Sequence, residues 1–301
     1  MELTGQEIRK SYGKKEVLCG IDLTLEEHKI YGLIGRNGAG KTTTIKMLST
    51  LILPTSGEVK INGLDVIKDR QKVKEILNVS PQETAIAPNL SVRENLEFMA
   101  GVYQIKSKEE KIKELISMFK LDDVLNQKAK TLSGGWQRKV SIAMALINDP
   151  KILFLDEPTI GLDAVSKISI RKFIKQVNED HKTTVVLTTH DMQDIEALTE
   201  RVILIGKGKI LLDGKYNELR KRASNDKTLD IEYSGTIPEL HEGMKLIKAQ
   251  EAQMTISLNP DIMSVSEAIS YLASHTTLMD VSVSDISAEQ MVAELYKEYR
   301  I

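Results

Sequence analysis

The feature that most constrains the fold of this chain is a glycine-rich segment placed directly after a short apolar run. The run, Ile30 to Ile34, has the composition of a buried strand. The segment that follows it is Gly35-Arg36-Asn37-Gly38-Ala39-Gly40-Lys41-Thr42. Glycines let the backbone curl so that successive N–H groups point at phosphate oxygens, and a helix beginning there adds its positive end. The segment therefore predicts a phosphate-binding P-loop, and the complete spacing disfavours a turn that only reverses the chain.

The P-loop assigns expected roles to its individual residues. Lys41 is expected to bridge the β and γ phosphates of a nucleoside triphosphate, and the Thr42 hydroxyl to bind Mg²⁺. The residues expected to surround the nucleotide phosphates are Gly35, Arg36, Asn37, Gly38, Ala39, Gly40, Lys41, Thr42 and Thr43.

A second apolar run, Ile152 to Leu155, leads into two acidic residues, Asp156 and Glu157. Open α/β sheets place ligand-binding groups at the carboxyl ends of their strands. We expect Asp156 to bind Mg²⁺ through water and Glu157 to act as the general base toward an attacking water. A merely solvated acidic pair is the alternative, but four apolar residues would hardly lead into one.

Helical and strand patterns alternate along the first 220 residues. Ile30 to Ile34, Ile152 to Leu155 and Thr184 to Thr189 lack alternation, as expected for parallel strands covered on both faces. Ser133 to Ile147 has helical periodicity. Val202 to Leu212 is expected to form a hairpin at the sheet edge, followed by a helix at Lys215 to Arg222. These patterns predict an α/β core.

The C-terminal part of the chain differs in pattern and charge. From about Lys227, short alternating runs (Thr228 to Tyr233, Met254 to Leu258, Met279 to Val283) and two helical stretches (Ile262 to Ser274, Ser287 to Tyr299) predict a small α+β domain at residues 227–301. Residues 226–301 carry a net charge of −8, against +6 for residues 1–225. The positive charge of the first part suits a polyphosphate ligand but is too dilute to indicate a nucleic acid partner.

Overall composition argues for a protein without membrane spans. Hydrophobic residues make up 41% and charged residues 28%, and no apolar run reaches the roughly 18 residues of a membrane helix. The first residues lack the pattern of a secretory signal, so export is not expected.

A third motif narrows the class of P-loop protein. Leu132-Ser133-Gly134-Gly135 opens the predicted helix, where Ser133 is a suitable N-cap and the glycines leave amides open to an anion. Between the P-loop and the Asp156 strand, this motif resembles the signature sequence of ABC ATPases. The resemblance covers about residues 2–220. It implies a P-loop NTPase cassette at residues 1–222 with a helical subdomain at about 83–147.

The resemblance also implies roles for further residues. Tyr12 matches the aromatic residue that stacks on adenine, and Gln82 the glutamine that touches Mg²⁺ and links the nucleotide site to a membrane partner. Asp163, in Gly161-Leu162-Asp163, matches the loop that crosses the dimer interface, and His190 the histidine that contacts the γ-phosphate. Trp136 stands where a glutamine is usual, and Lys139 where an arginine is common.

In the family, two cassettes pair head to tail. The resemblance implies that Ser133, Gly134 and Gly135 of one copy, with Asp163, close over ATP held by Lys41 of a second copy or a related cassette. The segment Glu83 to Gln104 is expected to receive a cytoplasmic helix of a separate multi-span membrane subunit. The cassette would then lie peripherally on the cytoplasmic side of the cell membrane.

A cassette followed by a small α+β tail, with Pro54-Thr55-Ser56-Gly57-Glu58 after the first helix, resembles bacterial exporter subunits of the drug, sodium, antibiotic-resistance or polysaccharide type, and an importer cassette is the alternative. A soluble ribosome-binding ABC protein would carry two cassettes, whereas this chain has one P-loop. A chromosome-maintenance ATPase would need a long coiled coil between Thr42 and Ser133. An inactive scaffold would be expected to lack Lys41, Glu157 or His190, and all three are present.

Overall fold

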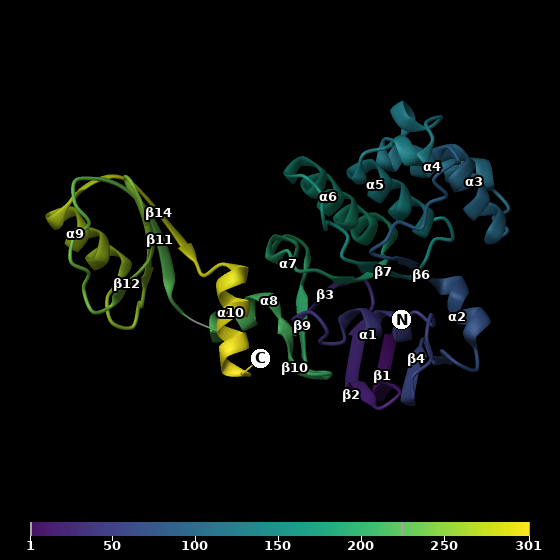
Figure 1. Cartoon of the computed structure of the whole chain (residues 1–301), viewed down its shortest axis with the longest axis horizontal. Coiled ribbons are helices and arrows are strands. Elements are labelled where there is room, and N and C mark those ends of the chain that lie inside the picture. Colours follow the sequence, from purple (N-terminus) through teal and green to yellow (C-terminus); the bar gives the residue numbers. More distant parts are fainter. Residues whose placement is uncertain (1, 224, 301) are drawn as a thin grey trace. The chain divides into compact units, whose positions relative to one another are not determined.

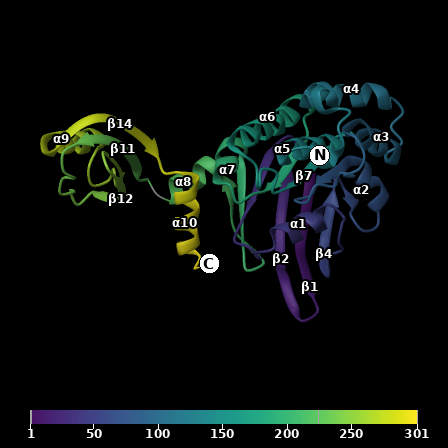
Figure 2. The same ribbon diagram turned by 45° about the horizontal axis from the view of Figure 1, so that its top comes forward.

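The computed structural model describes residues 2–223 and 225–300, which divide into two compact units. The first unit extends to Tyr216, and the second runs from Asn217 to Arg300. Figures 1 and 2 show the elements of both. Among the described residues no helix combines the length and apolarity needed to cross a membrane.

A six-stranded sheet forms the centre of the first unit, in the order β10-β9-β3-β8-β7-β6. β3 pairs in parallel with β8 and β9, β7 pairs in parallel with β6 and β8, and β10 returns antiparallel at the edge. The strands are β3 (Ile30–Ile34), β6 (Leu77–Ser80), β7 (Ile152–Asp156), β8 (Thr184–Thr188), β9 (Arg201–Gly206) and β10 (Lys209–Lys215). Every residue of β3, β7 and β8 is buried, as their unbroken apolar runs predicted.

An antiparallel sheet, β2-β1-β4-β5, lies on the other side of helix α1 (Lys41–Leu48), which contacts β2, β7 and β8 (Figure 2). Its strands are β1 (Glu2–Tyr12), β2 (Lys15–Glu26), β4 (Ser56–Ile61) and β5 (Leu64–Asp65). One apolar core joins the two sheets through α1, with Ile45, Met47 and Leu48 on the helix. The P-loop helix is therefore held by apolar contacts on both sides, which sets where the loop before it can lie.

Helices cover the rest of the parallel sheet. α2 (Arg70–Ile76) precedes β6, α6 (Ala164–His181) joins β7 to β8, and α7 (Met192–Leu198) joins β8 to β9. Between β6 and β7 the chain forms α3 (Val92–Val102), α4 (Lys108–Phe119) and α5 (Gly134–Ala145), which contact one another (Figure 1). Short 3₁₀ turns at Asp122–Val124 and Ala129–Thr131 connect α4 to α5.

The second unit has one antiparallel sheet in the order β12-β13-β11-β14. Its elements are α8 (Tyr216–Ala223, which begins in the first unit), β11 (Lys227–Ser234), β12 (Met244–Gln250), β13 (Gln253–Leu258), α9 (Val265–His275), β14 (Thr277–Asp285) and α10 (Ala288–Glu298). Side chains of β11 and β13 pack on Ala268 and Leu272 of α9 in a separate core. This arrangement is the α+β fold expected for the C-terminal part.

Several strands have no clear signal in the sequence. β1 carries charged residues and several register shifts, so its buried residues do not alternate cleanly, whereas Ile21, Leu23 and Leu25 of β2 alternate with exposed polar residues. β12 is an edge strand in which only Met244 is buried. Strand patterns depend on which face a sheet buries, and irregular or exposed strands lack that pattern.

Candidate active site at the P-loop

The P-loop connects β3 to α1, and two of its glycines are required by their surroundings. Gly35 has φ +154, and a Cβ there would lie 2.2 Å from the carbonyl oxygen of Ile205. Gly40 caps α1 with φ +113, and a Cβ there would lie 2.5 Å from Cδ2 of Leu18. Neither position accepts a side chain without movement of its neighbours. The close approach of β2 and β9 therefore shapes the loop that precedes the N-terminus of α1.

Lys41 lies inside this loop and is 7% exposed. Its Nζ donates to the carbonyl oxygens of Gly35 at 2.7 Å and Arg36 at 3.4 Å. Burial lowers the pKa of Lys41, while the negative charges of Glu157 and Asp156 act in the opposite direction. The ammonium group is thus held by backbone dipoles close to two carboxylates, where a triphosphate could compete for it.

Side-chain oxygens from the end of β7, the end of β8 and the first turn of α1 meet at Asp156, which is 5% exposed. Its Oδ1 accepts from Thr42 Oγ1 at 3.2 Å and from Thr188 Oγ1 at 2.5 Å. Hydroxyl and carboxylate oxygens are the ligands that Mg²⁺ takes in proteins. The donor set of Thr42 and Asp156 therefore fits a magnesium ion beside the phosphates.

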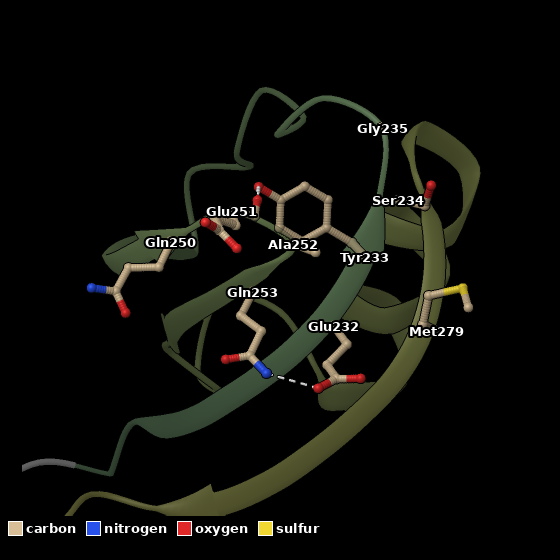
Figure 3. A pocket seen from close by; sticks show the side chains of 9 residues that line it. All are labelled: Glu232, Tyr233, Ser234, Gly235, Gln250, Glu251, Ala252, Gln253 and Met279. Atoms are coloured by element: carbon tan, nitrogen blue, oxygen red, sulfur yellow. Dashed lines mark hydrogen bonds between the residues drawn. The ribbon is translucent and has the colours of Figure 1, made fainter.

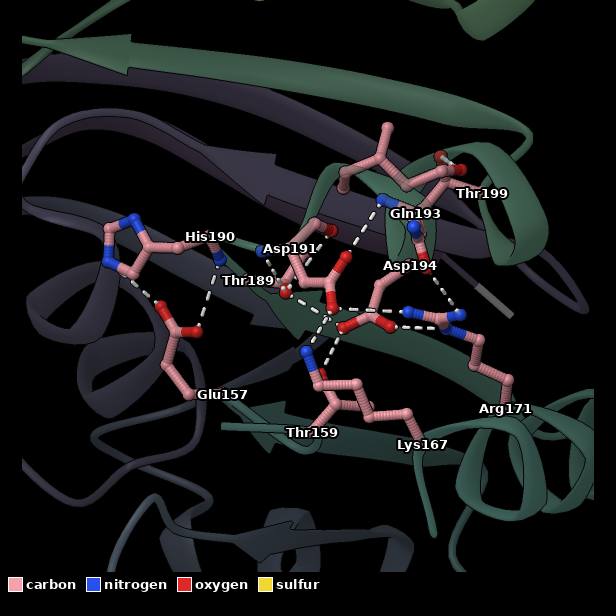
Figure 4. Close-up of polar contacts among 11 residues, drawn as sticks. Glu157, Thr159, Lys167, Arg171, Thr189, His190, Asp191, Gln193, Asp194 and Thr199 are labelled. Atoms are coloured by element: carbon pink, nitrogen blue, oxygen red, sulfur yellow. Dashed lines mark hydrogen bonds and ion pairs between the residues drawn. The ribbon is translucent and has the colours of Figure 1, made fainter. Parts of the chain in front are cut away.

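Glu157 and His190 contact each other at the ends of β7 and β8 (Figure 4). The Glu157 carboxylate accepts from the His190 backbone N–H at 3.1 Å, and its other oxygen lies 3.1 Å from the His190 ring Nε2. That ring nitrogen also lies 3.4 Å from Lys41 Nζ. Burial raises the pKa of Glu157, opposed by His190 and Lys41. A buried carboxylate with a raised pKa is a suitable proton acceptor.

The backbone of Glu157 has φ +51, an uncommon conformation for a residue with a side chain. Its N–H donates to both the carbonyl and the hydroxyl oxygen of Thr188, each at 3.1 Å. β8 therefore holds Glu157 in the conformation that turns its side chain toward His190.

These groups open into a hollow of about 470 Å³ at the carboxyl ends of β3, β6, β7 and β8. It is lined by Lys15, Val17, Asn37, Gly38, Gly40, Lys41, Thr42, Thr43, Gln82, Glu157, Ile160 and His190. The structure thus brings most of the predicted phosphate and hydrolytic residues together. Lys15, Val17 and Ile160 also line the hollow without any signal in the sequence. Tyr12 does not line it, but pairs with Lys15 across the β1–β2 turn and is 52% exposed.

A larger hollow of about 1240 Å³ lies in the second unit (Figure 3). Its charged lining residues are Glu232 and Glu251, and Gln253 donates to Glu232 at 2.7 Å. Among the residues that the structure describes, no lysine or arginine lines it. A triphosphate would meet like charge there, so the smaller P-loop hollow is the candidate nucleotide site.

The signature segment and Asp163 lie next to each other but outside the lining of the P-loop hollow. A Cβ on Gly135 would lie 2.4 Å from Ser166 Oγ and 3.0 Å from Ser166 Cβ, so a larger residue there would displace the Ser166 side chain. Asp163 caps α6 by accepting from the Ser166 backbone at 2.9 Å and from its hydroxyl at 2.7 Å. Ser133 occupies the predicted N-cap position of α5, and its side chain makes no capping hydrogen bond.

Residues 18–160 match the ABC transporter family. The linearmycin resistance ATP-binding protein LnrL of Bacillus subtilis is 36% identical over 235 residues, 77% of this chain and 75% of LnrL. The chain belongs to the ABC transporter ATP-binding family. The ATP-binding protein NatA of the same organism is 33% identical over 75% of this chain and 92% of NatA. The ATP-binding cassette MJ0796, solved as a dimer in a post-hydrolysis state with ADP and Pi, is 28% identical with a TM-score of 0.65, covering 71% of this chain and 98% of that one.

This ABC cassette is therefore an ATP-binding ATPase, and its fold is the predicted P-loop NTPase cassette. Its structure adds Arg138, a residue that the sequence did not single out. Arg138, on α5, is 4% exposed and donates from Nη1 to the Pro81 carbonyl at 2.7 Å and from Nη2 to the Gln82 carbonyl at 2.6 Å. Burial lowers the pKa of Arg138, opposed by Asp156 and Glu157. The helix that begins at the signature thus holds the backbone of Gln82.

The departures from the family pattern have structural consequences in the cassette. Gln137, next to Trp136, donates to the carbonyls of Ala129 and Leu132, both at 3.2 Å. Lys139 Nζ lies 4.4 Å from the centre of the Trp136 ring, a cation–π contact. Trp136 and Lys139 therefore pair with each other, while Gln137 holds the backbone that leads into the signature.

Proposed function

We propose that this cassette is the ATP-hydrolysing subunit of a bacterial ABC exporter, acting on a separate membrane subunit at the cytoplasmic side of the cell membrane. The observation that carries the proposal is the meeting of Lys41, Glu157 and His190 in one hollow at the strand ends. The similarity to a resistance protein such as LnrL favours export, and an importer cassette is the alternative.

The residues of the hollow have different roles in ATP hydrolysis. Lys41 and the loop amides bind the β and γ phosphates, and His190 contacts the γ-phosphate. Glu157 accepts a proton from water as the water oxygen bonds to the γ-phosphorus. The bond from that phosphorus to the bridging oxygen breaks, so ADP and phosphate leave. Mg²⁺ held by Thr42, Gln82 and, through water, Asp156 would neutralise charge on the phosphate oxygens.

A second cassette would complete the site. Ser133, Gly134, Gly135 and Asp163 lie outside the hollow of their own chain, which suits contact with ATP on a partner copy. Near Asp163, Ile160 and Val165 are 45% and 77% exposed. Closing two copies over ATP would cover these apolar side chains. ATP then favours the closed pair, and loss of phosphate removes that preference. Tyr12 would stack on the adenine at the open edge.

The membrane subunit would dock on α3, within the predicted segment Glu83 to Gln104. Phe98 and Val102, one helical turn apart, are 60% and 57% exposed. Large apolar side chains on one face of a helix suit a partner helix. Residues 227–301 would form an accessory domain that is distinct from the cassette at 1–222.

The test is purification of the tagged chain from detergent-solubilised membranes of its own organism. A stoichiometric multi-span protein is the expected companion, and its identity would indicate the class of substrate. Phe98→Asp should lose this companion, whereas Ile262→Asp, at a residue 53% exposed in the second unit, should keep it. Ribosomes, or no membrane protein at all, would contradict the transporter role and leave only the nucleotide chemistry.

A further inference from the structure

A fully buried carboxylate lies behind the hydrolytic site. Asp194, on α7, is 0% exposed, and its two oxygens accept three side-chain hydrogen bonds (Figure 4). Thr159 Oγ1 donates to Oδ2 at 2.5 Å, Thr189 Oγ1 donates to Oδ2 at 2.8 Å, and Arg171 Nε donates to Oδ1 at 2.6 Å. A buried charge is costly unless it is paired and hydrogen-bonded, so the three donors specify where Asp194 lies.

The same arginine also reaches the N-terminus of α7. Asp191, the N-cap of α7, accepts from Arg171 Nη2 at 3.2 Å and from Lys167 Nζ at 2.7 Å. Arg171 Nη1 donates to the Gln193 side chain at 3.3 Å. Two cations of α6 therefore balance two carboxylates of α7. The planar guanidinium directs Nε, Nη1 and Nη2 at three separate side chains in a fixed geometry, which the compact ammonium of a lysine does not reproduce.

This network encloses His190 from both sides along the chain. Thr189 and Asp191 are its direct neighbours, and the Asp191 N–H donates to Thr189 Oγ1 at 3.0 Å. Thr159 follows Glu157 by two residues. Thr159, Thr189 and Asp191, three residues beside the His190–Glu157 contact, are thus tied to Arg171 or Asp194, although neither of these two lines the nucleotide hollow.

We propose that Arg171 and Asp194 are positioning residues that hold His190 and Glu157 in hydrolytic geometry and make that geometry depend on the placement of helix α6. α6 begins at its N-cap Asp163, and Arg171 lies about two turns further along. A helix moves as a unit, so a shift of the Asp163 end shifts the acceptors of Arg171 and the backbone of His190. The inference rests on the hydrolytic roles proposed for Glu157 and His190.

Arg171→Lys tests the bridge while keeping the positive charge. We expect kcat for ATP hydrolysis to fall about tenfold, because small displacements of catalytic groups are costly, with KM and ATP affinity within about twofold of the unaltered chain. The matched control is Arg201→Lys. Arg201 donates to both oxygens of Asp213 at 2.6 and 2.7 Å, on the β9–β10 hairpin. This control loses an equivalent pair of guanidinium hydrogen bonds, and its kcat should stay within about twofold of the unaltered chain.

Thr159→Val decides the question if Arg171→Lys does not fold, because it removes one hydrogen bond to Asp194 and no charge. It should also lower kcat several-fold without changing ATP affinity. A kcat within twofold of the unaltered chain in the folded variants would overturn the inference. The inference would also be overturned if kcat fell no more than it does in Arg201→Lys, or if only ATP affinity were lost. Failure of the hydrolytic assignment is detected separately, by Glu157→Gln retaining full turnover.

Discussion

Glu157→Gln separates the chemical step from nucleotide binding, because it changes one functional group and little of the geometry. The amide oxygen of glutamine can still accept from the His190 N–H, which the carboxylate does at 3.1 Å. Lys41, with its contact to the Gly35 carbonyl, and Thr42, with its contact to Asp156, are untouched. The phosphate-binding groups therefore remain in place, and the variant lacks only the proton acceptor.

The expected magnitude follows from the role of the lost group. General base catalysis contributes about 10²- to 10⁴-fold to the rate, or about 2.7 to 5.4 kcal/mol of activation free energy. ATP affinity should stay within about threefold or increase, since one of two carboxylates beside the triphosphate loses its charge.

Phosphate release at saturating Mg-ATP measures turnover, and calorimetric titration measures ATP affinity. Gel filtration with ATP should show the variant accumulating as a nucleotide-bound dimer. The control is Glu110→Gln, an exposed carboxylate on α4, which should leave all three measurements unchanged. Turnover of Glu157→Gln within threefold of the unaltered chain would refute the assignment of Glu157 as the base.

Four further outcomes are expected. Burial raises the pKa of Glu157 above its value of 4.5 in the unfolded chain. At a pH between the unfolded and folded pKa values, folding therefore takes up a proton, and the contribution of this carboxyl to stability falls as the pH rises through that interval. Without nucleotide, Glu157→Gln should therefore melt at a higher temperature than the unaltered chain at neutral pH, and the difference should vanish near pH 4.5; no gain at neutral pH would contradict this. Lys41→Ala should lower ATP affinity about 100-fold or more in a nucleotide titration, because charge-assisted bonds to phosphate contribute about 1.5–3 kcal/mol each. Arg138→Lys should lower the free energy of unfolding by a similar 1.5–3 kcal/mol in urea, since the compact ammonium of lysine does not reproduce the pair of N–H groups that Arg138 directs at the two carbonyls. Gly35→Ala should lower the free energy of unfolding by more than about 3 kcal/mol, because the new Cβ would clash with the Ile205 carbonyl. Gly38→Ala, at φ +80 but with open space around it, should lower it by only about 1 kcal/mol. Equal losses in the two variants would show that the contact with β9 does not matter.

The sequence alone determined the parts of the site that depend on consecutive residues. The run Ile30 to Ile34, the glycines after it and Lys41 form one strand–loop–helix unit, because the glycines allow the positive φ values that such a loop requires. The buried strand that ends at Asp156 is likewise formed by consecutive residues. Apolar runs without alternation predicted β3, β7 and β8, because a parallel sheet buries both faces of its central strands.

Only the tertiary structure decided which residues from distant parts of the sequence contact the P-loop and the Asp156 strand or the segments around them. Arg138 binds the carbonyls of Pro81 and Gln82, far away in the sequence, and no local pattern distinguishes it from a solvated arginine. Asp194 would pass for an exposed helix residue, yet it is 0% exposed and holds donors from two other segments. Lys15 reaches the nucleotide hollow only because β2 packs beside α1. Chain folding determines burial and long-range contacts, and these in turn determine whether a charged side chain is solvated or part of the site.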